Sequence, residues 1–215
     1  MLYDFIDVLR RVAPRLSSLA ETTFDFDEVE KRCRGWGWLL TEDDPGLGVA
    51  RFRVDEWREV IFDAGKSGGL NGRTCLWLAL CYWPDDEASQ SADGQEGRDD
   101  AGGETGRADY DARFEAACDE LSASLGPPAV RGKYEYGHRA GWPYSYAVWC
   151  AERGFLVLQQ DELDIQFGFD ISIWVLAARD GESLPSFPLT AESPTGNRSA
   201  STGITDPRWD RELEA

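Results

Sequence analysis

Hydrophobic and polar residues alternate along residues 163–177. The odd positions carry a series of large apolar side chains, namely Leu163, Ile165, Phe167, Phe169, Ile171, Ile173 and Val175. Successive side chains of a strand point to opposite faces of its sheet, so this period of two predicts a strand with one buried face. The other face, with Asp164, Gln166 and Asp170, is expected to meet water or a partner. A straight strand of this length would span roughly 50 Å, so we expect a bulge or bend at Gly168.

Two further runs rich in β-formers precede this stretch, at residues 144–151 and 155–160. Short polar connections at residues 152–154 and 161–162 separate the three runs. Connections this short join antiparallel neighbours, because a parallel crossover needs a dozen or more residues. The sequence therefore predicts a three-stranded antiparallel meander over residues 144–177.

Two amphipathic helices are expected beside this sheet. Apolar residues recur at spacings of three and four near residues 2–19 and again near residues 109–125, where the sequence Gly126-Pro127-Pro128 provides a stop. Strands are expected near residues 49–54 and 74–83, and the second is apolar on both faces, as in a covered sheet. We therefore predict an α+β fold with a largely antiparallel sheet flanked by helices.

The segment of residues 84–108 differs from the rest of the chain in composition. It is rich in acidic residues and glycine and has no large apolar residue. Such a segment buries too little surface to offset its ordering entropy, so we expect a disordered loop. It separates an N-terminal α+β part, residues 1–83, from a C-terminal one, residues 109–178, that shares or duplicates the sheet. Residues 179–215 are expected to form a flexible tail.

The chain is strongly acidic, with 22 basic and 40 acidic residues and a formal net charge of -18. This charge repels nucleic acid and anionic membranes and favours a basic protein partner. The first residues carry an acid where a secretory signal would be basic, and no apolar run is long enough to span a membrane. We therefore expect a cytoplasmic protein, whose five cysteines are reduced thiols in the core.

Catalytic motifs are scarce. His138 is the single histidine of the chain, and no nucleophile motif accompanies it. The sequence Gly65-Lys66-Ser67 lacks the spacing of a phosphate-binding Walker loop and is expected to be a turn. The cysteines lack the spacing of zinc ligands. We therefore expect no catalytic residue, metal or cofactor.

One cluster of acids lies on predicted regular structure, at Asp161, Glu162, Asp164 and Asp170. If Asp164 and Asp170 share the polar face of the long strand, their oxygens could hold a divalent cation or act as an acid and base pair. Such chemistry needs a concave site. The competing interpretation is a solvated sheet face, which we favour in a chain this acidic.

An interaction surface is the preferred interpretation of the polar face and the loop beside it. Tyr136 and Trp142 lie in the expected loop of residues 131–143, and aromatic side chains are common anchors in protein interfaces. Together with Asp164, Gln166 and Asp170 they form the predicted partner-binding set.

These observations favour a non-enzymatic, acidic protein-binding module. In composition and architecture it is similar to the small immunity proteins that neutralise bacterial toxins and to acidic chaperones of secreted effectors, although no residue motif carries a site across. A metal-dependent or carboxylate-based hydrolase using the Asp161, Glu162, Asp164 and Asp170 cluster is the alternative. A structural subunit of an assembly is a further one, and the oligomeric state is left open.

Overall fold

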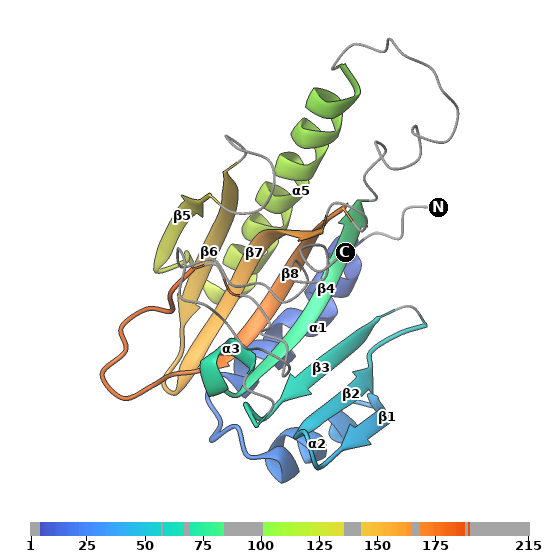
Figure 1. Cartoon of the computed structure of the whole chain (residues 1–215), viewed down its shortest axis with the longest axis vertical. Helices are drawn as coiled ribbons and strands as arrows, with labels where there is room; N and C mark the ends of the chain where they lie inside the picture. Colours follow the sequence, from blue (N-terminus) through green and yellow to red (C-terminus); the bar gives the residue numbers. More distant parts are fainter. Residues whose placement is uncertain are drawn as a thin grey trace, which may run out of the picture.

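The computed structural model describes residues 5–56, 58–66, 69–83, 101–135, 143–164, 168–187 and 189. One antiparallel sheet of eight strands, in the order β1-β2-β3-β4-β8-β7-β6-β5, runs through these residues (Figure 1). Its strands are β1 (Leu39–Asp44), β2 (Val49–Arg53), β3 (Glu59–Asp63), β4 (Cys75–Trp83), β5 (Val130–Tyr134), β6 (Tyr144–Cys150), β7 (Gly154–Asp164) and β8 (Gly168–Ala177). The helices are α1 (Phe5–Leu19), α2 (Phe26–Gly35), α3 (Gly69–Gly72) and α5 (Ala101–Leu125).

The element order repeats itself. Helices α1 and α2 precede the strands β1 to β4, and helix α5 precedes the strands β5 to β8. The last strands of the two halves, β4 and β8, pair with each other in the centre of the sheet, with Leu78 opposite Ile173. The halves therefore meet through an antiparallel pair and form one continuous sheet.

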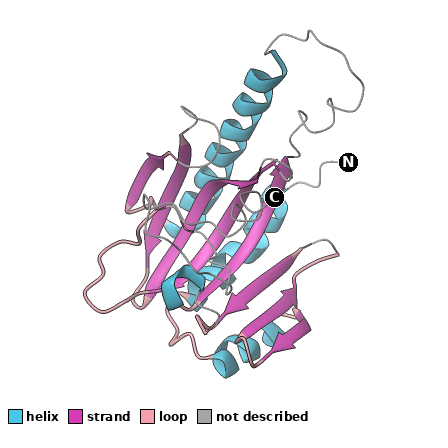
Figure 2. Cartoon of the chain, in the orientation of Figure 1, coloured by secondary structure: helices cyan, strands magenta, loops and turns pink. Residues whose placement is uncertain are grey.

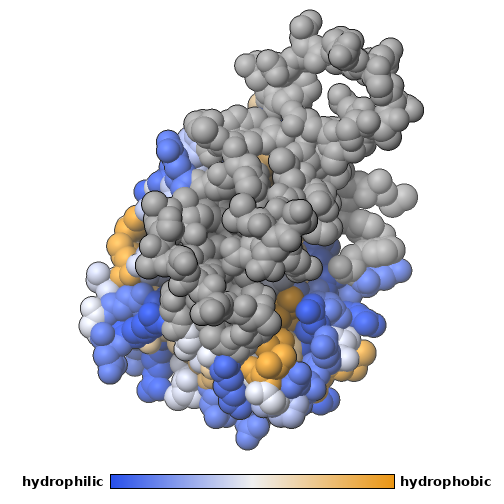
Figure 3. Space-filling view, viewed as in Figure 1, coloured by the Kyte–Doolittle hydropathy of each residue, from blue (hydrophilic) through white to orange (hydrophobic). Residues whose placement is uncertain are grey.

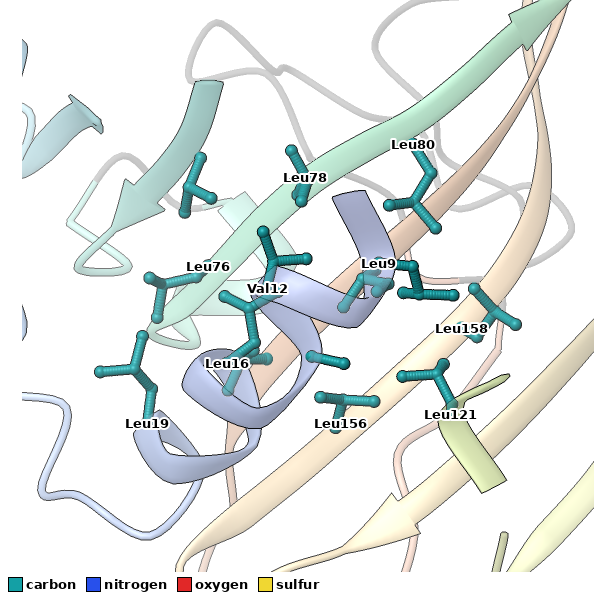
Figure 4. Packing of buried hydrophobic residues seen from close by; sticks show 14 of the residues in the cluster. Leu9, Val12, Leu16, Leu19, Leu76, Leu78, Leu80, Leu121, Leu156 and Leu158 are labelled. Atoms are coloured by element: carbon teal, nitrogen blue, oxygen red, sulfur yellow. The ribbon is translucent and has the colours of Figure 1, made fainter. Parts of the chain in front are cut away.

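Helices α1, α2 and α5 form a layer on one face of the sheet, behind it in the view of Figure 2. The core lies between these two layers (Figure 4) and includes Leu9, Val12, Leu16 and Leu19 of α1, Leu76, Leu78 and Leu80 of β4, Leu156 and Leu158 of β7, and Leu121 of α5. Each such leucine contributes about 1.5–3 kcal/mol by its removal from water. The apolar residues whose spacing of three and four predicted α1 and α5 are therefore the residues that these helices bury against the sheet. No helix in the described part of the chain is sufficiently long and apolar to cross a membrane.

The meander over residues 144–177 is confirmed, but its second turn lies elsewhere. Strand β7 continues to Asp164 and β8 begins at Gly168, so the connection is residues 165–167, which lie outside the described residues. The expected connection at residues 161–162 belongs instead to β7, where Asp161 pairs with Asp170. The apolar and polar residues of 163–177 keep the same alternation on both sides of this connection. The period of two therefore did not show where β7 ends and β8 begins.

The expectation of a solvated polar face on the last strand was wrong. Asp170, Ser172, Trp174 and Leu176 point away from the helices and are nevertheless buried. Leu70 of α3 and Leu189 lie in the same apolar cluster as Trp174 and Leu176, and Phe187 packs against it. Sequence pattern could not show this cover, because it comes from short segments with few apolar residues.

A few residues between 179 and 189 contact the rest of the chain, whereas a flexible tail was expected from residue 179 onwards. Glu182 pairs with Arg73, and Arg179 Nη2 donates to the Leu70 carbonyl oxygen at 3.2 Å. The ring of Phe187 stacks on that of Tyr146 at 3.8 Å between centroids. A few specific contacts therefore order this stretch without a continuous apolar stripe. Residues 188 and 190–215 lie outside the described residues.

Helix α5 begins at Ala101 and so takes up the end of the segment predicted to be a disordered loop. Arg107 bonds to Asp111 one turn later at 2.9 Å and also donates to the Pro143 carbonyl oxygen, which ties this part of the helix to the chain before β6. Residues 84–100 lie outside the described residues. Strands β1 and β5 were not predicted. Both are edge strands with partly exposed side chains and no regular apolar alternation.

Candidate functional site

The sheet face that points away from the helices is partly exposed over β2 and β3 in the described part of the chain. In β2 the small and aromatic residues Ala50 and Phe52 are buried toward the helices, so the alternate residues Arg51 and Arg53 point outward. Antiparallel pairing places Arg51 beside Ile61 of β3 and Ile61 beside Trp77 of β4. We call the outward residues Arg51, Arg53, Glu59, Ile61, Trp77 and Ala79 the open face.

A recess of about 340 Å³ lies in this open face. Hydrophobic and hydrophilic residues lie side by side on the part of the surface where Figure 1 places β1 to β3 (Figure 3). The recess is lined by Arg51, Arg53, Asp55, Glu56, Arg58, Glu59, Ile61, Trp77 and Ala79. It therefore combines guanidinium groups, carboxylates and an indole ring within one concave site.

Arg58 is the most firmly held cation of the recess. Its backbone N–H donates to Asp55 Oδ1 at 2.9 Å, and its Nη1 bonds to Asp55 Oδ2 at 3.2 Å. Its Nε donates to the carbonyl oxygen of Leu80 at 3.2 Å, and only 13% of its side chain is exposed. A guanidinium with this many fixed partners is preorganised, and the carboxylate of Asp55 compensates its charge.

The other two arginines of the recess also face carboxylates. Arg51 Nε lies 2.8 Å from Glu42 Oε2, and Arg53 Nη2 lies 3.8 Å from Glu59 Oε1. Glu59 is held in addition by Thr41, whose hydroxyl donates to Oε1 at 2.9 Å. Glu56 differs from these acids, because it makes no hydrogen bond or ion pair with the described residues.

The predicted acid cluster has a different geometry from the one expected. Asp161 and Asp170 lie directly opposite each other on β7 and β8, and about 2% of each residue is exposed. Gln159 lies opposite Ser172 on the same face, and its amide Nε2 donates to Asp161 Oδ2 at 3.4 Å and to the Leu189 carbonyl oxygen at 3.0 Å. Asp170 is therefore a buried residue, and the expectation that it forms part of an exposed docking surface was wrong.

On the helix side, the same strand segment is held by hydrogen bonds to α5. The Tyr110 hydroxyl lies 2.7 Å from the Asp170 carbonyl oxygen and 3.1 Å from that of Asp161, and donates to them. Burial raises the pKa of Tyr110 well above its ordinary value, and the nearby Asp170 adds to this effect. Gln160 Nε2 donates to Asp111 Oδ1 at 2.8 Å, and Gln160 Oε1 accepts from the Ser145 N–H at 2.8 Å. This network fixes the position of α5 on the sheet.

The remaining predicted site residues fall mostly outside the described residues. Tyr136, Trp142 and Gln166 are among these, and Asp164 is described through its backbone, which pairs with Gly168 at the end of the β7–β8 hairpin. Glu162 lies opposite Phe169 in the same ladder. Within the described ranges, no group of three or more His, Cys, Asp or Glu residues is placed to hold a metal ion.

Comparison of the chain with protein-family models, curated proteins and solved structures gives no match.

Sequence pattern did not predict the residues that line the recess. The signal that was present is the alternation of Arg51 and Arg53 with buried Ala50 and Phe52, which marks a strand with one polar face. The contribution of Trp77 could not be inferred, because it depends on the register of β3 against β4.

Proposed function

We propose that this protein is a non-enzymatic binding module that captures a basic protein stoichiometrically on the open face of its sheet. The recess beside Trp77 is the observation that carries the proposal. Arginine and tryptophan are enriched among the residues that dominate binding energy in protein interfaces. The paired arginines and carboxylates supply a polar rim around Ile61 and Trp77.

The contrast between the two halves of the sheet supports the choice of this face. Over β6 to β8 the outward face is covered by Leu70, Phe187 and Leu189 of the same chain. Over β2 and β3 the outward side chains are partly exposed, with 52% of the Arg53 side chain and 40% of the Arg51 side chain accessible. A partner that docks there would cover the open half much as the chain covers its own other half.

The net charge of -18 supports a basic partner. A strongly acidic body attracts such a partner at long range, and electrostatic steering of this kind raises association rates at low salt. Toxin-neutralising immunity proteins and effector chaperones act by stoichiometric capture of this type, and we place the protein in that functional class.

Affinity capture from a lysate of the source organism tests the proposal. An Ile61→Arg variant fills the recess with a long cationic side chain, and Ala116→Arg is the matched control, because Ala116 is exposed on α5 in the helix layer. Wild type and Ala116→Arg are expected to retain one protein of basic isoelectric point at a stoichiometric ratio, more strongly at low salt. Ile61→Arg is expected to lose it. Equal retention by all three forms would contradict the proposed surface.

A second candidate function, the hydrolase, is favoured by one observation, the two buried carboxylates of Asp161 and Asp170 opposite each other. Oxygen ligands of this kind suit Mg²⁺, Ca²⁺ or Mn²⁺. A cation bound to the folded state would raise the melting temperature of wild type, and an Asp170→Asn variant would lose that increase. No increase with any of the three ions would reject a metal-dependent enzyme at this pair.

A further inference from the structure

We infer that the recess in the open face receives a cationic side chain, an arginine or a lysine, from the protein partner. This inference rests on the proposed function and specifies the chemistry of the contact. It follows from two features of the recess, the charge that remains after its internal ion pairs are formed and the position of Trp77.

The lining holds three arginines and three acids, and one of the acids, Glu56, is left without an ion pair to the described residues. Arg58 pairs with Asp55 at 3.2 Å, and Arg51 pairs with Glu42 at 2.8 Å just outside the lining. Arg53 and Glu59 lie 3.8 Å apart and compensate each other more loosely. Asp55 is shared with Arg11, whose Nη2 lies 3.9 Å from its Oδ2. Glu56 is the lining acid without an ion pair to the described residues, so its carboxylate is the charge left to meet an occupant.

Trp77 provides an aromatic surface for the incoming cation. Its side chain lines the recess and is half-buried, and its ring lies 5.8 Å from that of Trp174, which limits its movement on the side of the covered half. A guanidinium or ammonium group near an indole ring gains about 0.5–1 kcal/mol at an exposed site and more where water is excluded. The aliphatic part of such a side chain would contact Ile61 and Ala79, which also line the recess.

An anionic occupant fits the same recess less well. The three arginines already have carboxylate partners that compensate their charge, so a carboxylate from outside would gain less from them than from unpaired guanidinium groups. It would also approach the uncompensated Glu56. The cationic choice agrees with the net charge of the whole chain, so steering and local recognition favour the same partner.

Nuclear magnetic resonance of the indole N–H of Trp77 tests this inference directly. The signal is assigned in ¹⁵N-labelled protein by its loss in a Trp77→Phe variant, and the probes are N-acetyl-arginine amide, N-acetyl-glutamine amide and N-acetyl-glutamate amide at low salt. We expect a saturable shift with the arginine probe and a weaker response to the other two. The Glu56→Gln variant should bind the arginine probe about threefold more weakly than wild type, because it loses one partly exposed ion pair with the probe.

Glu152→Gln is the matched control, because it removes the same charge at an exposed position in the β6–β7 turn. It is expected to bind the arginine probe as wild type does. The inference is overturned if the glutamate probe moves the Trp77 signal more strongly than the arginine probe, if the arginine probe leaves it unmoved, or if Glu56→Gln binds that probe as tightly as wild type.

The capture experiment with Ile61→Arg and the titration of the Trp77 signal distinguish failure of the proposed function from failure of the cationic anchor. If Ile61→Arg abolishes protein capture while the arginine probe leaves Trp77 unmoved, the open face is a docking surface and the cationic anchor is wrong. If the arginine probe binds as expected while Ile61→Arg captures the partner normally, the recess recognises cations and the proposed function is wrong.

Discussion

The indole rings of Trp77 and Trp174 lie 5.8 Å apart on neighbouring strands of the same sheet face, where the two halves of the chain meet. Trp174 is covered, with 4% of the residue exposed, while Trp77 is half-buried and lines the recess. The boundary between the self-covered half of the face and the open half therefore runs between two tryptophans in contact.

Truncation of these two tryptophans should have unequal effects on stability. Trp174→Ala leaves a cavity in a covered cluster and is expected to lower the free energy of unfolding by about 3–5 kcal/mol. Trp77→Ala removes a ring that already contacts solvent and should cost less than about 2 kcal/mol. Urea unfolding of both variants measures the difference. Equal losses would show that the face around Trp77 is as well covered as that around Trp174.

Stability should fall as the pH rises above about 8.5, where thiols of the unfolded chain ionise. Burial raises the pKa of Cys33 to about 12 in the folded protein. Below pH 8.5 both states keep this proton. Above it the folded state holds the proton and the unfolded state loses it, so the free energy of unfolding decreases until the folded thiol also ionises.

A Cys33→Ala variant measures this contribution. Between pH 8 and pH 10 under reducing conditions, wild type should lose about 2 kcal/mol more than Cys33→Ala, the effect of one proton over that interval. Cys150→Ala, in which an exposed thiol is removed, should follow the wild-type pH dependence. Parallel curves for wild type and Cys33→Ala would contradict the burial of the Cys33 thiol.

Thiol reactivity should single out Cys150. Cys33, Cys75 and Cys118 are buried and Cys81 is half-buried. Burial raises the pKa of each of these four thiols, so they ionise rarely at neutral pH. Cys150, at the end of β6, is exposed. Native protein at pH 8 should therefore show one fast reaction with a disulfide reagent, absent from Cys150→Ser. Rapid modification of a buried thiol would show that the core opens locally.

Gly154 should tolerate no side chain. A Cβ atom built there would collide with the Leu176 carbonyl oxygen, a backbone atom of the neighbouring strand. Gly154→Ala is expected to destabilise the protein by about 3 kcal/mol, at the upper end of the cost of overpacking. Gly35→Ala is the control, because a Cβ atom there meets nothing within 4 Å, and it should leave the melting temperature unchanged or slightly higher. A similar effect of both substitutions would contradict the close approach of β7 to β8.

Sequence pattern predicted those parts of the fold in which one element carries its own signal. The stripe of Leu9, Val12 and Leu16 defines α1, and the apolar run of β4 marks a central strand. It failed at Asp170, because the cover of that face comes from residues such as Leu189 that are distant in the chain and have no periodic signal. It missed the recess because strand register brings Trp77 beside Ile61.

The most direct test of the central claim is hydroxyl-radical footprinting of the chain with its captured partner. The open face predicts that oxidation of Trp77 falls several-fold in the complex, while oxidation of Trp149, which packs on the helix side of the sheet, is unchanged. An unchanged rate of oxidation at Trp77, with protection confined to residues of α1 and α5, would contradict docking on the open face.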